Sequence, residues 1–424
     1  MTHTPVLLVA GRQSQRIGGM TLVERAAAVA VRTGFGPVHV HGTPVPPADL
    51  DALARRYGPD ITVHTDAAPL AGIPVGSPLL ALGPDALLGP EVVRAFASHA
   101  ARPGTGPLAV VRDGTGLALY IPSVTSAMTR ASSLDLLLAD LDSTAVVERL
   151  AHPGLFIERV PPDVDARDLA RRFIRHLNGR GEAHFTKRIR RYSVPLSAWL
   201  TDRGVRPSMV TLGGLLLAVL SALALAQGDY LLGLLGAAAY YASMVLDCSD
   251  GEVARLSVRD SAFGAWFETV VDYGTYVLVL TALFVATQSG EHAAFYRLAT
   301  LFAAASSAVV IAVASYLRRR VAGADPGQFD DASASALAKA GRLHRFARWG
   351  RQWIKRSTMA HLIVAFALVG RLELLILLWA FGASLAGLVI IAVEPFVVRS
   401  VKVAAQSAAA PPLASRKGGT RAAL

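Results

Sequence analysis

The chain has 424 residues, of which 53% are hydrophobic and only 17% charged, and its mean hydropathy is +0.42. This composition excludes an ordinary soluble protein and predicts a membrane protein long enough for two domains. The net charge of +11 suits acidic partners, and because the basic residues flank apolar segments, lipid headgroups and phosphate-bearing substrates are favoured over nucleic acid. The single cysteine, Cys248, excludes an internal disulfide and a cysteine-based zinc site.

Short apolar segments alternate with helical patterns over residues 1–180. A helical pattern at 22–34 follows the first of these segments. Such alternation predicts a soluble α/β domain with a largely parallel sheet. A basic juxtamembrane segment at 181–206 joins this domain to the rest of the chain. The segments rich in β-forming residues and bounded by Gly, Pro or Asp are 5–11, 36–42, 60–65, 77–83 and 106–113.

Six apolar segments after residue 206 are candidate membrane spans, namely 209–226, 230–246, 266–287, 295–317, 359–370 and 372–393. The fifth is short for a hydrocarbon core about 30 Å thick. Lys and Arg gather before the first span, between the second and third, in the linker 318–356 and in the C-terminal tail. The positive-inside rule therefore predicts an all-α six-helix domain at 207–400 in the cell membrane, with both termini and the loop between spans two and three in the cytoplasm.

Basic residues recur at every third position within the linker, at Lys339, Arg342, Arg345, Arg348 and Arg351. Leu, Phe and Trp side chains lie among them, which predicts an amphipathic helix on the cytoplasmic leaflet. A solvated charged loop is the alternative. Residues 401–424 have the composition of a disordered tail.

Four carboxylates around the loop between the second and third spans recur at helical spacing. Asp247 and Asp250 are three residues apart and Glu268 and Asp272 are four apart, so each pair shares one helix face. Carboxylates at the edge of hydrocarbon are costly and usually mark functional sites. Because divalent cations prefer hard oxygen ligands, the cluster predicts a metal site, with interfacial ion pairs as the alternative.

Residues 247–272 fit the pattern D-x2-D-G-x2-A-R-x8-G-x3-D-x3-D, except that Glu268 replaces the third aspartate. The segment resembles the signature of the CDP-alcohol phosphotransferase family of integral-membrane enzymes. Upstream, Arg-Pro-Ser-Met-Val-Thr at 206–211 resembles the Pro-Asn-x-x-Thr that opens the first span in many members, with Ser208 in place of Asn. The resemblance covers roughly residues 180–400.

This resemblance implies a transferase that moves a substituted phosphate group from a CDP-alcohol to a hydroxyl acceptor and releases CMP. The implied metal site, for Mg2+ or Mn2+, comprises Asp247, Asp250, Glu268 and Asp272. Asp272 would also be the general base that takes the proton of the acceptor. Small residues would let the nucleotide approach the backbone, and Arg255 could pair with the diphosphate. The residues implied in CDP binding are Asp247, Gly251, Ala254, Arg255, Gly264 and Thr211.

Glu268 keeps the charge of the aspartate that it replaces, but its extra methylene group displaces the carboxylate. We expect a working site with altered metal geometry or preference, and loss of activity is the alternative. Glu252 and Asp260 lie outside the pattern and are expected to be solvated loop charges.

Basic residues beside the first and fourth spans are candidates for binding the phosphate of an acceptor. They are Lys187, Arg188, Arg190 and Arg191 before the first span and Arg318, Arg319 and Arg320 at the end of the fourth. Some members of the family bind a phosphorylated acceptor near the second group. Positive-inside anchoring is the alternative for both groups.

The N-terminal segment resembles the start of a nucleotidyltransferase domain, in which a strand ends in a Gly-rich loop that holds nucleotide phosphates. Ala10, Gly11 and Arg16 match that pattern, whereas Gln13 stands where a second glycine is expected. Asp85 lies where such domains place a metal-binding aspartate. The alternative is that it is a turn residue after a strand. We therefore predict a nucleotidyltransferase-like domain that has lost catalysis and serves as a docking or structural domain.

A nucleotidyltransferase-like domain followed by this membrane domain resembles the arrangement in bifunctional enzymes that make CDP-inositol and then join it to a second inositol phosphate. A di-inositol-phosphate-phosphate synthase type is therefore the favoured expectation, with CDP-alcohol and inositol phosphate as substrates. A phospholipid synthase that uses CDP-diacylglycerol and a non-catalytic membrane protein are the alternatives. Family members are commonly homodimers, so a homodimer is also a possible assembly.

Overall fold

The computed structural model describes residues 6–10, 16–42, 61–64, 73–178, 184–321 and 356–388, apart from short gaps. The gaps are at 84, 103, 113–114, 127, 129–136, 140, 143–146, 151–154, 162 and 386. The chain divides into two compact units. The first comprises residues 1–182, 187–214 and 245–271, and the second comprises 183–186, 215–244 and 272–424. The first unit therefore contains the N-terminal domain together with the helix ends that carry most of the acidic motif.

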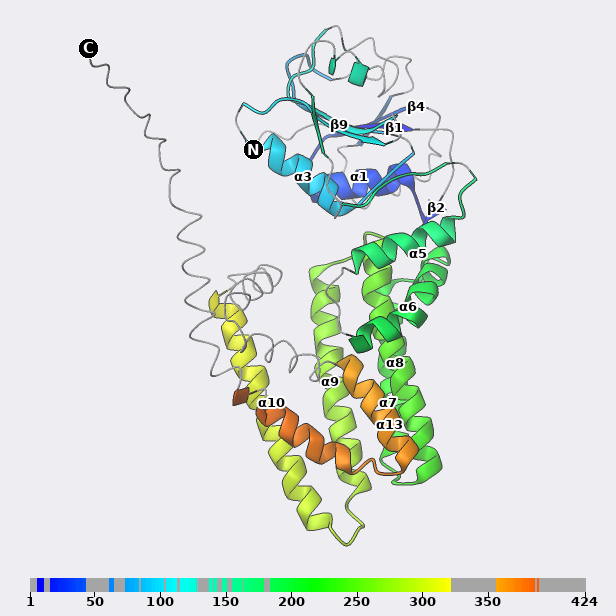
Figure 1. Cartoon of the computed structure of the whole chain (residues 1–424), viewed down its shortest axis with the longest axis vertical. Helices are drawn as coiled ribbons and strands as arrows, with labels where there is room; N and C mark the ends of the chain where they lie inside the picture. The colour runs from blue at the N-terminus through cyan, green and yellow to red at the C-terminus, as the bar shows by residue number, and fades with distance from the viewer. Residues whose placement is uncertain are drawn as a thin grey trace, which may run out of the picture. The chain divides into compact units, whose positions relative to one another are not determined.

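A seven-stranded sheet forms the centre of the N-terminal domain, in the order β10-β8-β9-β6-β1-β4-β5 (Figure 1). Its strands are β1 (Val6–Ala10), β4 (Val38–Gly42), β5 (Ile61–His64), β6 (Leu79–Leu82), β8 (Leu108–Arg112), β9 (Thr115–Ile121) and β10 (Glu148–Arg149). All five predicted strand segments are confirmed. Four of the six strand pairings are parallel and both pairings of β9 are antiparallel, so the sheet is largely parallel as predicted.

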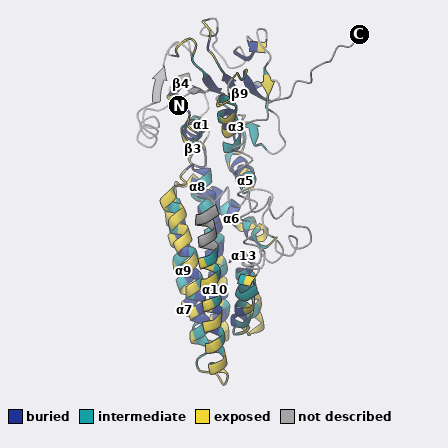
Figure 2. Ribbon diagram, turned by 90° about the vertical axis from the view of Figure 1, so that its left-hand side faces the viewer, coloured by how far each residue is buried: buried dark blue, intermediate teal, exposed yellow. Residues whose placement is uncertain are grey.

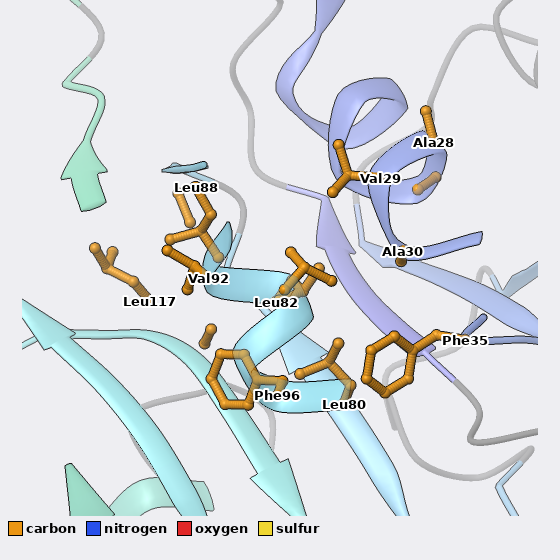
Figure 3. Close-up of a cluster of buried hydrophobic side chains, with 14 of the residues drawn as sticks. Ala28, Val29, Ala30, Phe35, Leu80, Leu82, Leu88, Val92, Phe96 and Leu117 are labelled. Atoms are coloured by element: carbon orange, nitrogen blue, oxygen red, sulfur yellow. The ribbon is translucent and has the colours of Figure 1, made fainter. Parts of the chain in front are cut away.

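Two helices, α1 (Leu22–Arg32) and α3 (Pro90–Ala100), lie on one face of this sheet (Figure 1). Thr21 and Glu24 form a capping box that starts α1, and Pro90 occupies the first turn of α3, where its missing N–H costs nothing. Side chains alternate between faces along a strand. Leu80 and Leu82 therefore pack toward α1 and α3, as Figure 3 shows, whereas Leu79 and Ala81 join a separate core on the opposite face.

Short elements complete the domain. A hairpin of β2 (Arg16–Ile17) and β3 (Met20–Thr21) turns at Gly18 and Gly19, which have φ angles of 62° and 75° that favour glycine. A second small sheet pairs β7 (Ala86–Leu88) with β11 (Ile157–Arg159). Helix α5 (Ala166–Leu177) begins at Asp165, whose carboxylate accepts from the Arg167 N–H.

The remaining described helices are α6 (His184–Asp202), α7 (Pro207–Leu225), α8 (Tyr230–Leu256), α9 (Ala262–Ala286), α10 (Ala293–Val321) and α13 (Arg356–Val369). The four helices α7 to α10 are long and apolar enough to cross a membrane, which confirms the first four predicted spans. Exposed apolar side chains recur along α7 at Leu212, Leu216, Leu220 and Leu223, and exposed residues also run along α9 and α10 in Figure 2. Such a face suits contact with lipid tails.

The prediction of six spans, the fifth of them short, is only partly confirmed. The fifth predicted segment forms α13, with 14 residues, and the described part of the sixth forms a short helix at Leu374–Leu385. A helix rises about 1.5 Å per residue, so neither described helix reaches across a core of about 30 Å by itself. The end of the predicted sixth span, the predicted amphipathic helix of the linker and the predicted disordered tail lie outside the described residues.

Candidate functional site

Three of the four predicted metal ligands belong to the first compact unit. Asp247 and Asp250 lie one turn apart near the end of α8, and Glu268 lies near the start of α9. Helix α9 begins where the Ser261 hydroxyl accepts a hydrogen bond from the Gly264 N–H at 3.0 Å, a side-chain N-cap. Asp250 is buried, Asp247 is half-buried and Glu268 is exposed. Both Asp247 and Glu268 are close enough to repel the Asp250 carboxylate electrostatically.

Asp250 has an environment that suits a metal ligand. It is only 3% exposed, and its Oδ2 accepts a hydrogen bond from the Thr211 hydroxyl at 2.7 Å. Its Oδ1 is buried, and the described residues supply no hydrogen-bond partner for it. A buried carboxylate oxygen without a partner is costly, and a cation would satisfy it. Because Mg2+ and Mn2+ prefer oxygen donors, the residues present fit such an ion, although no three His, Cys, Asp or Glu in the described part of the chain are gathered closely enough to hold one.

Asp272 lies one turn beyond Glu268 on α9 and belongs to the second unit. Its carboxylate is about one-third exposed and forms an ion pair with the guanidinium of Arg356, the first residue of α13. Arg356 is buried, and it was not among the site residues predicted from the sequence. Its position at the boundary between a basic linker and an apolar helix is the only sequence signal for it, and that signal equally suits a membrane anchor.

Arg255 lies back over the preceding turn of α8. A Cβ atom at Gly251 would lie 3.2 Å from Arg255 Nη1, so the absence of a side chain at Gly251 gives room to the guanidinium. Arg255 Nη2 donates to the side-chain oxygen of Asn178, just after α5, at 2.9 Å. Of the other residues predicted to bind CDP, Ala254 is half-buried on α8, and Gly264 lies in the first turn of α9, where its N–H donates to Ser261.

The expectation that Glu252 is a solvated loop charge is wrong. Glu252 is 1% exposed, because α6 and the end of α5 cover this side of α8 and supply its hydrogen-bond donors. The donors are Arg190 Nη1 at 2.7 Å, Asn178 Nδ2 at 2.9 Å, Ser193 Oγ at 3.0 Å and Ser197 Oγ at 2.6 Å. The polar residues of α6 recur at i, i+3 and i+7, a stripe in the sequence that could have indicated a buried partner. Asp260, by contrast, is exposed as expected.

The basic candidates separate into two kinds. Lys187, Arg188 and Arg191 are exposed on α6, whereas Arg190 faces α8 and donates to both Glu252 and the Cys248 carbonyl oxygen. Arg318, Arg319 and Arg320 belong to the last turns of α10, and their side chains lie outside the described residues.

The predicted nucleotide loop is only partly described. Gly11 lies outside the described residues, and Arg16 is exposed in β2. Asp85 occupies a turn before β7, where its carboxylate pairs with Arg159 at 2.6 Å. This placement agrees with the interpretation of Asp85 as a turn residue.

Comparison with known proteins gives two findings. Residues 205–344 match the family model described as CDP-alcohol phosphatidyltransferase. A protein of Archaeoglobus fulgidus named "Bifunctional IPC transferase and DIPP synthase" is 34% identical over 116 residues, which cover 26% of this chain and 23% of the relative. The match thus spans about a quarter of the relative's length. Both findings agree with the family suggested by the signature at 247–272.

Proposed function

We propose that this chain, whose residues 205–344 carry a CDP-alcohol phosphatidyltransferase domain, transfers a substituted phosphate group from a CDP-alcohol to a hydroxyl acceptor and releases CMP. The observation that carries the proposal is the buried Asp250 within the family signature, with one oxygen held by Thr211 and the other without a partner among the described residues. An interfacial ion pair would place a cation at that oxygen instead.

Asp250 would hold the divalent ion, and the carboxylates of Asp247 and Glu268 would close on the ion as it binds, because no three acidic groups are gathered closely enough in the described residues. When bound, Mg2+ or Mn2+ supplies positive charge that neutralises the diphosphate and the leaving CMP. Arg255 pairs with the diphosphate through its planar, multi-donor guanidinium. These residues bind and orient the CDP-alcohol, and they lie within one compact unit.

Asp272 accepts the proton of the attacking hydroxyl. The acceptor oxygen forms a bond to the distal phosphorus, the bond between that phosphorus and the bridging oxygen breaks, and CMP leaves with the electron pair. Asp272 forms an ion pair with Arg356 that holds its carboxylate in position, and a carboxylate can accept the proton of a nearby hydroxyl. The general base must loosen from Arg356 as the acceptor hydroxyl arrives.

Two substrate classes suit this site. The name of the Archaeoglobus fulgidus relative includes "DIPP synthase", which favours CDP-inositol and an inositol phosphate. A phospholipid synthase that uses CDP-diacylglycerol is favoured by a different observation: Trp266 and Val270, next to Glu268 along α9, are 59% and 47% exposed apolar residues. Glu268 is itself exposed on this apolar stretch of α9, which suits an opening toward lipid tails, where a diacylglycerol chain would lie.

The N-terminal domain serves, on our proposal, as a structural domain that holds the end of α8. The Arg25 guanidinium, on α1, donates to the Leu256 and Arg255 carbonyl oxygens, and Arg32 donates to Asp260 at 2.7 Å. Val258, between these contacts, has a φ of 50°, which costs a β-branched residue conformational energy and persists only where its surroundings hold it. Arg25 thus caps the helix that carries the signature.

The test is CMP release by the purified full-length protein with Mg2+ or Mn2+. One reaction contains CDP-inositol with inositol phosphate, and a second contains CDP-diacylglycerol with the same acceptor. Release in the first supports the di-inositol type, and release only in the second supports a phospholipid synthase. Folded protein that releases CMP in neither reaction, nor with other CDP-alcohols, would leave the non-catalytic alternative.

A further inference from the structure

Glu252 has no role in the transfer reaction proposed above, yet it is buried and held by side chains from outside α8. Its side chain is fully buried, and its carboxylate accepts from four donors on two elements outside α8. Arg190 balances its charge directly. A buried ion pair of this kind seldom stabilises a fold more than well-packed apolar side chains would. Its presence therefore calls for a geometric explanation.

The geometry beyond Glu252 leads to Arg255. Asn178 donates from Nδ2 to Glu252 Oε1 at 2.9 Å, and its Oδ1 accepts from Arg255 Nη2 at 2.9 Å. A carboxylate can only accept and a guanidinium can only donate, so a side chain that bridges them needs one donor and one acceptor. The amide of asparagine meets that need, and the carboxylate fixes which end of the amide faces the arginine.

Gly251 completes the arrangement. Because a Cβ atom there would lie 3.2 Å from Arg255 Nη1, any larger residue would displace the guanidinium by a few tenths of an ångström. Asn178 thus holds one side of the guanidinium while Gly251 leaves room for the other. An arginine side chain whose guanidinium is already held in this way loses less conformational entropy when it binds a diphosphate.

We propose that Glu252 and Asn178 are positioning residues that set the Arg255 guanidinium for the diphosphate of the CDP-alcohol. Glu252 orients the Asn178 amide, and Asn178 orients Arg255. The inference rests on the proposed function, because it assigns the diphosphate to Arg255.

A double-mutant cycle tests the proposal. The affinity of the full-length protein for CDP in the presence of Mn2+ is measured by calorimetry for the wild type, Asn178→Ala, Arg255→Ala and the double variant. Loss of a charge-assisted hydrogen bond predicts about tenfold weaker CDP binding for Arg255→Ala and a smaller loss for Asn178→Ala. Since Asn178 acts through Arg255, Asn178→Ala should have no further effect in the Arg255→Ala background.

Ser197→Ala is the matched control. It removes a 2.6 Å hydrogen bond to the other oxygen of the Glu252 carboxylate without touching Asn178. It should lower the melting temperature but leave CDP affinity within about twofold, since the Asn178 bridge stays intact. Asn178→Asp, which keeps an acceptor for Arg255 but repels Glu252, is a second variant should Asn178→Ala fold poorly, and it should also weaken CDP binding.

The outcomes separate the two proposals. The positioning role would be overturned if Asn178→Ala weakened CDP binding equally in the wild-type and Arg255→Ala backgrounds. It would also be overturned if Asn178→Ala weakened CDP binding no more than Ser197→Ala does, while Arg255→Ala weakened it clearly. Either result would leave the proposed transferase function intact. Folded wild-type protein that fails to bind CDP at all would overturn both.

Discussion

Thr211→Val provides a direct test of the candidate metal site. The Thr211 hydroxyl donates to Asp250 Oδ2 at 2.7 Å, and Asp250 is only 3% exposed. Valine has nearly the same shape as threonine but no donor. The substitution therefore removes the hydrogen bond that orients the carboxylate while preserving most of the packing between α7 and α8.

The expected magnitude follows from that geometry. A hydrogen bond from a neutral donor to a buried carboxylate contributes about 1.5–3 kcal/mol, and loss of a residue that orients a metal ligand typically costs about 10–100-fold in metal affinity. We therefore expect the Mn2+ concentration for half-maximal CMP release to rise by about 10–100-fold. The activity at saturating Mn2+ should fall far less, because Asp250 itself remains.

The assay is a Mn2+ titration of CMP release, paired with a direct Mn2+-binding measurement by electron paramagnetic resonance. Ser221→Ala is the matched control: Ser221 is a buried hydroxyl on the same helix that donates to the Gly236 carbonyl at 2.7 Å, not to a carboxylate. It should leave the Mn2+ dependence unchanged. If Thr211→Val changed the Mn2+ dependence no more than Ser221→Ala does, Asp250 would not be a ligand oriented by Thr211.

Three further predictions concern the base, the third ligand and the N-terminal domain. Asp272→Asn should lower kcat by about 10²–10⁴-fold while CDP-alcohol binding measured by calorimetry stays largely intact, and full activity would remove Asp272 from the role of base. Glu268→Asp should keep or raise CMP release, and complete loss would show that the site is built around glutamate. Arg25→Ala removes a buried helix cap and a cation–π contact with Phe173 at 4.4 Å, so it should destabilise the fold by about 2–4 kcal/mol in thermal unfolding. Arg32→Ala breaks only an exposed pair with Asp260 and should cost less than about 1 kcal/mol; equal effects of the two variants would argue against a capping role for Arg25.

The burial of Glu252 changes how the signature can be interpreted. The pattern leaves position 252 unspecified, yet in this chain that residue connects α5, α6 and α8. An unspecified position of the motif can thus support a specified one, Arg255, through a neighbour outside the motif. Substitutions at Glu252 are expected to affect stability and nucleotide binding together.

Local features of the sequence determined the elements and suggested the family. Strand segments such as 77–83 and the helical pattern at 22–34 were predictable because side-chain periodicity and bounding Gly or Pro residues are local properties. The spans formed by α7 to α10 were predictable because length and apolar composition suffice. The prediction of a metal site at the acidic motif likewise came from the spacing of four carboxylates along two helices.

Only the tertiary structure decided which side chains meet. Glu252 became buried because α6, about 60 residues earlier, places Arg190, Ser193 and Ser197 against it, and no local pattern encodes that partner. The pairing of Asp272 with Arg356 joins residues 84 positions apart, and the antiparallel insertion of β9 between β6 and β8 depends on sheet pairing. Periodicity specifies which face of an element is apolar or polar, whereas the identity of the partner on that face depends on how the chain packs.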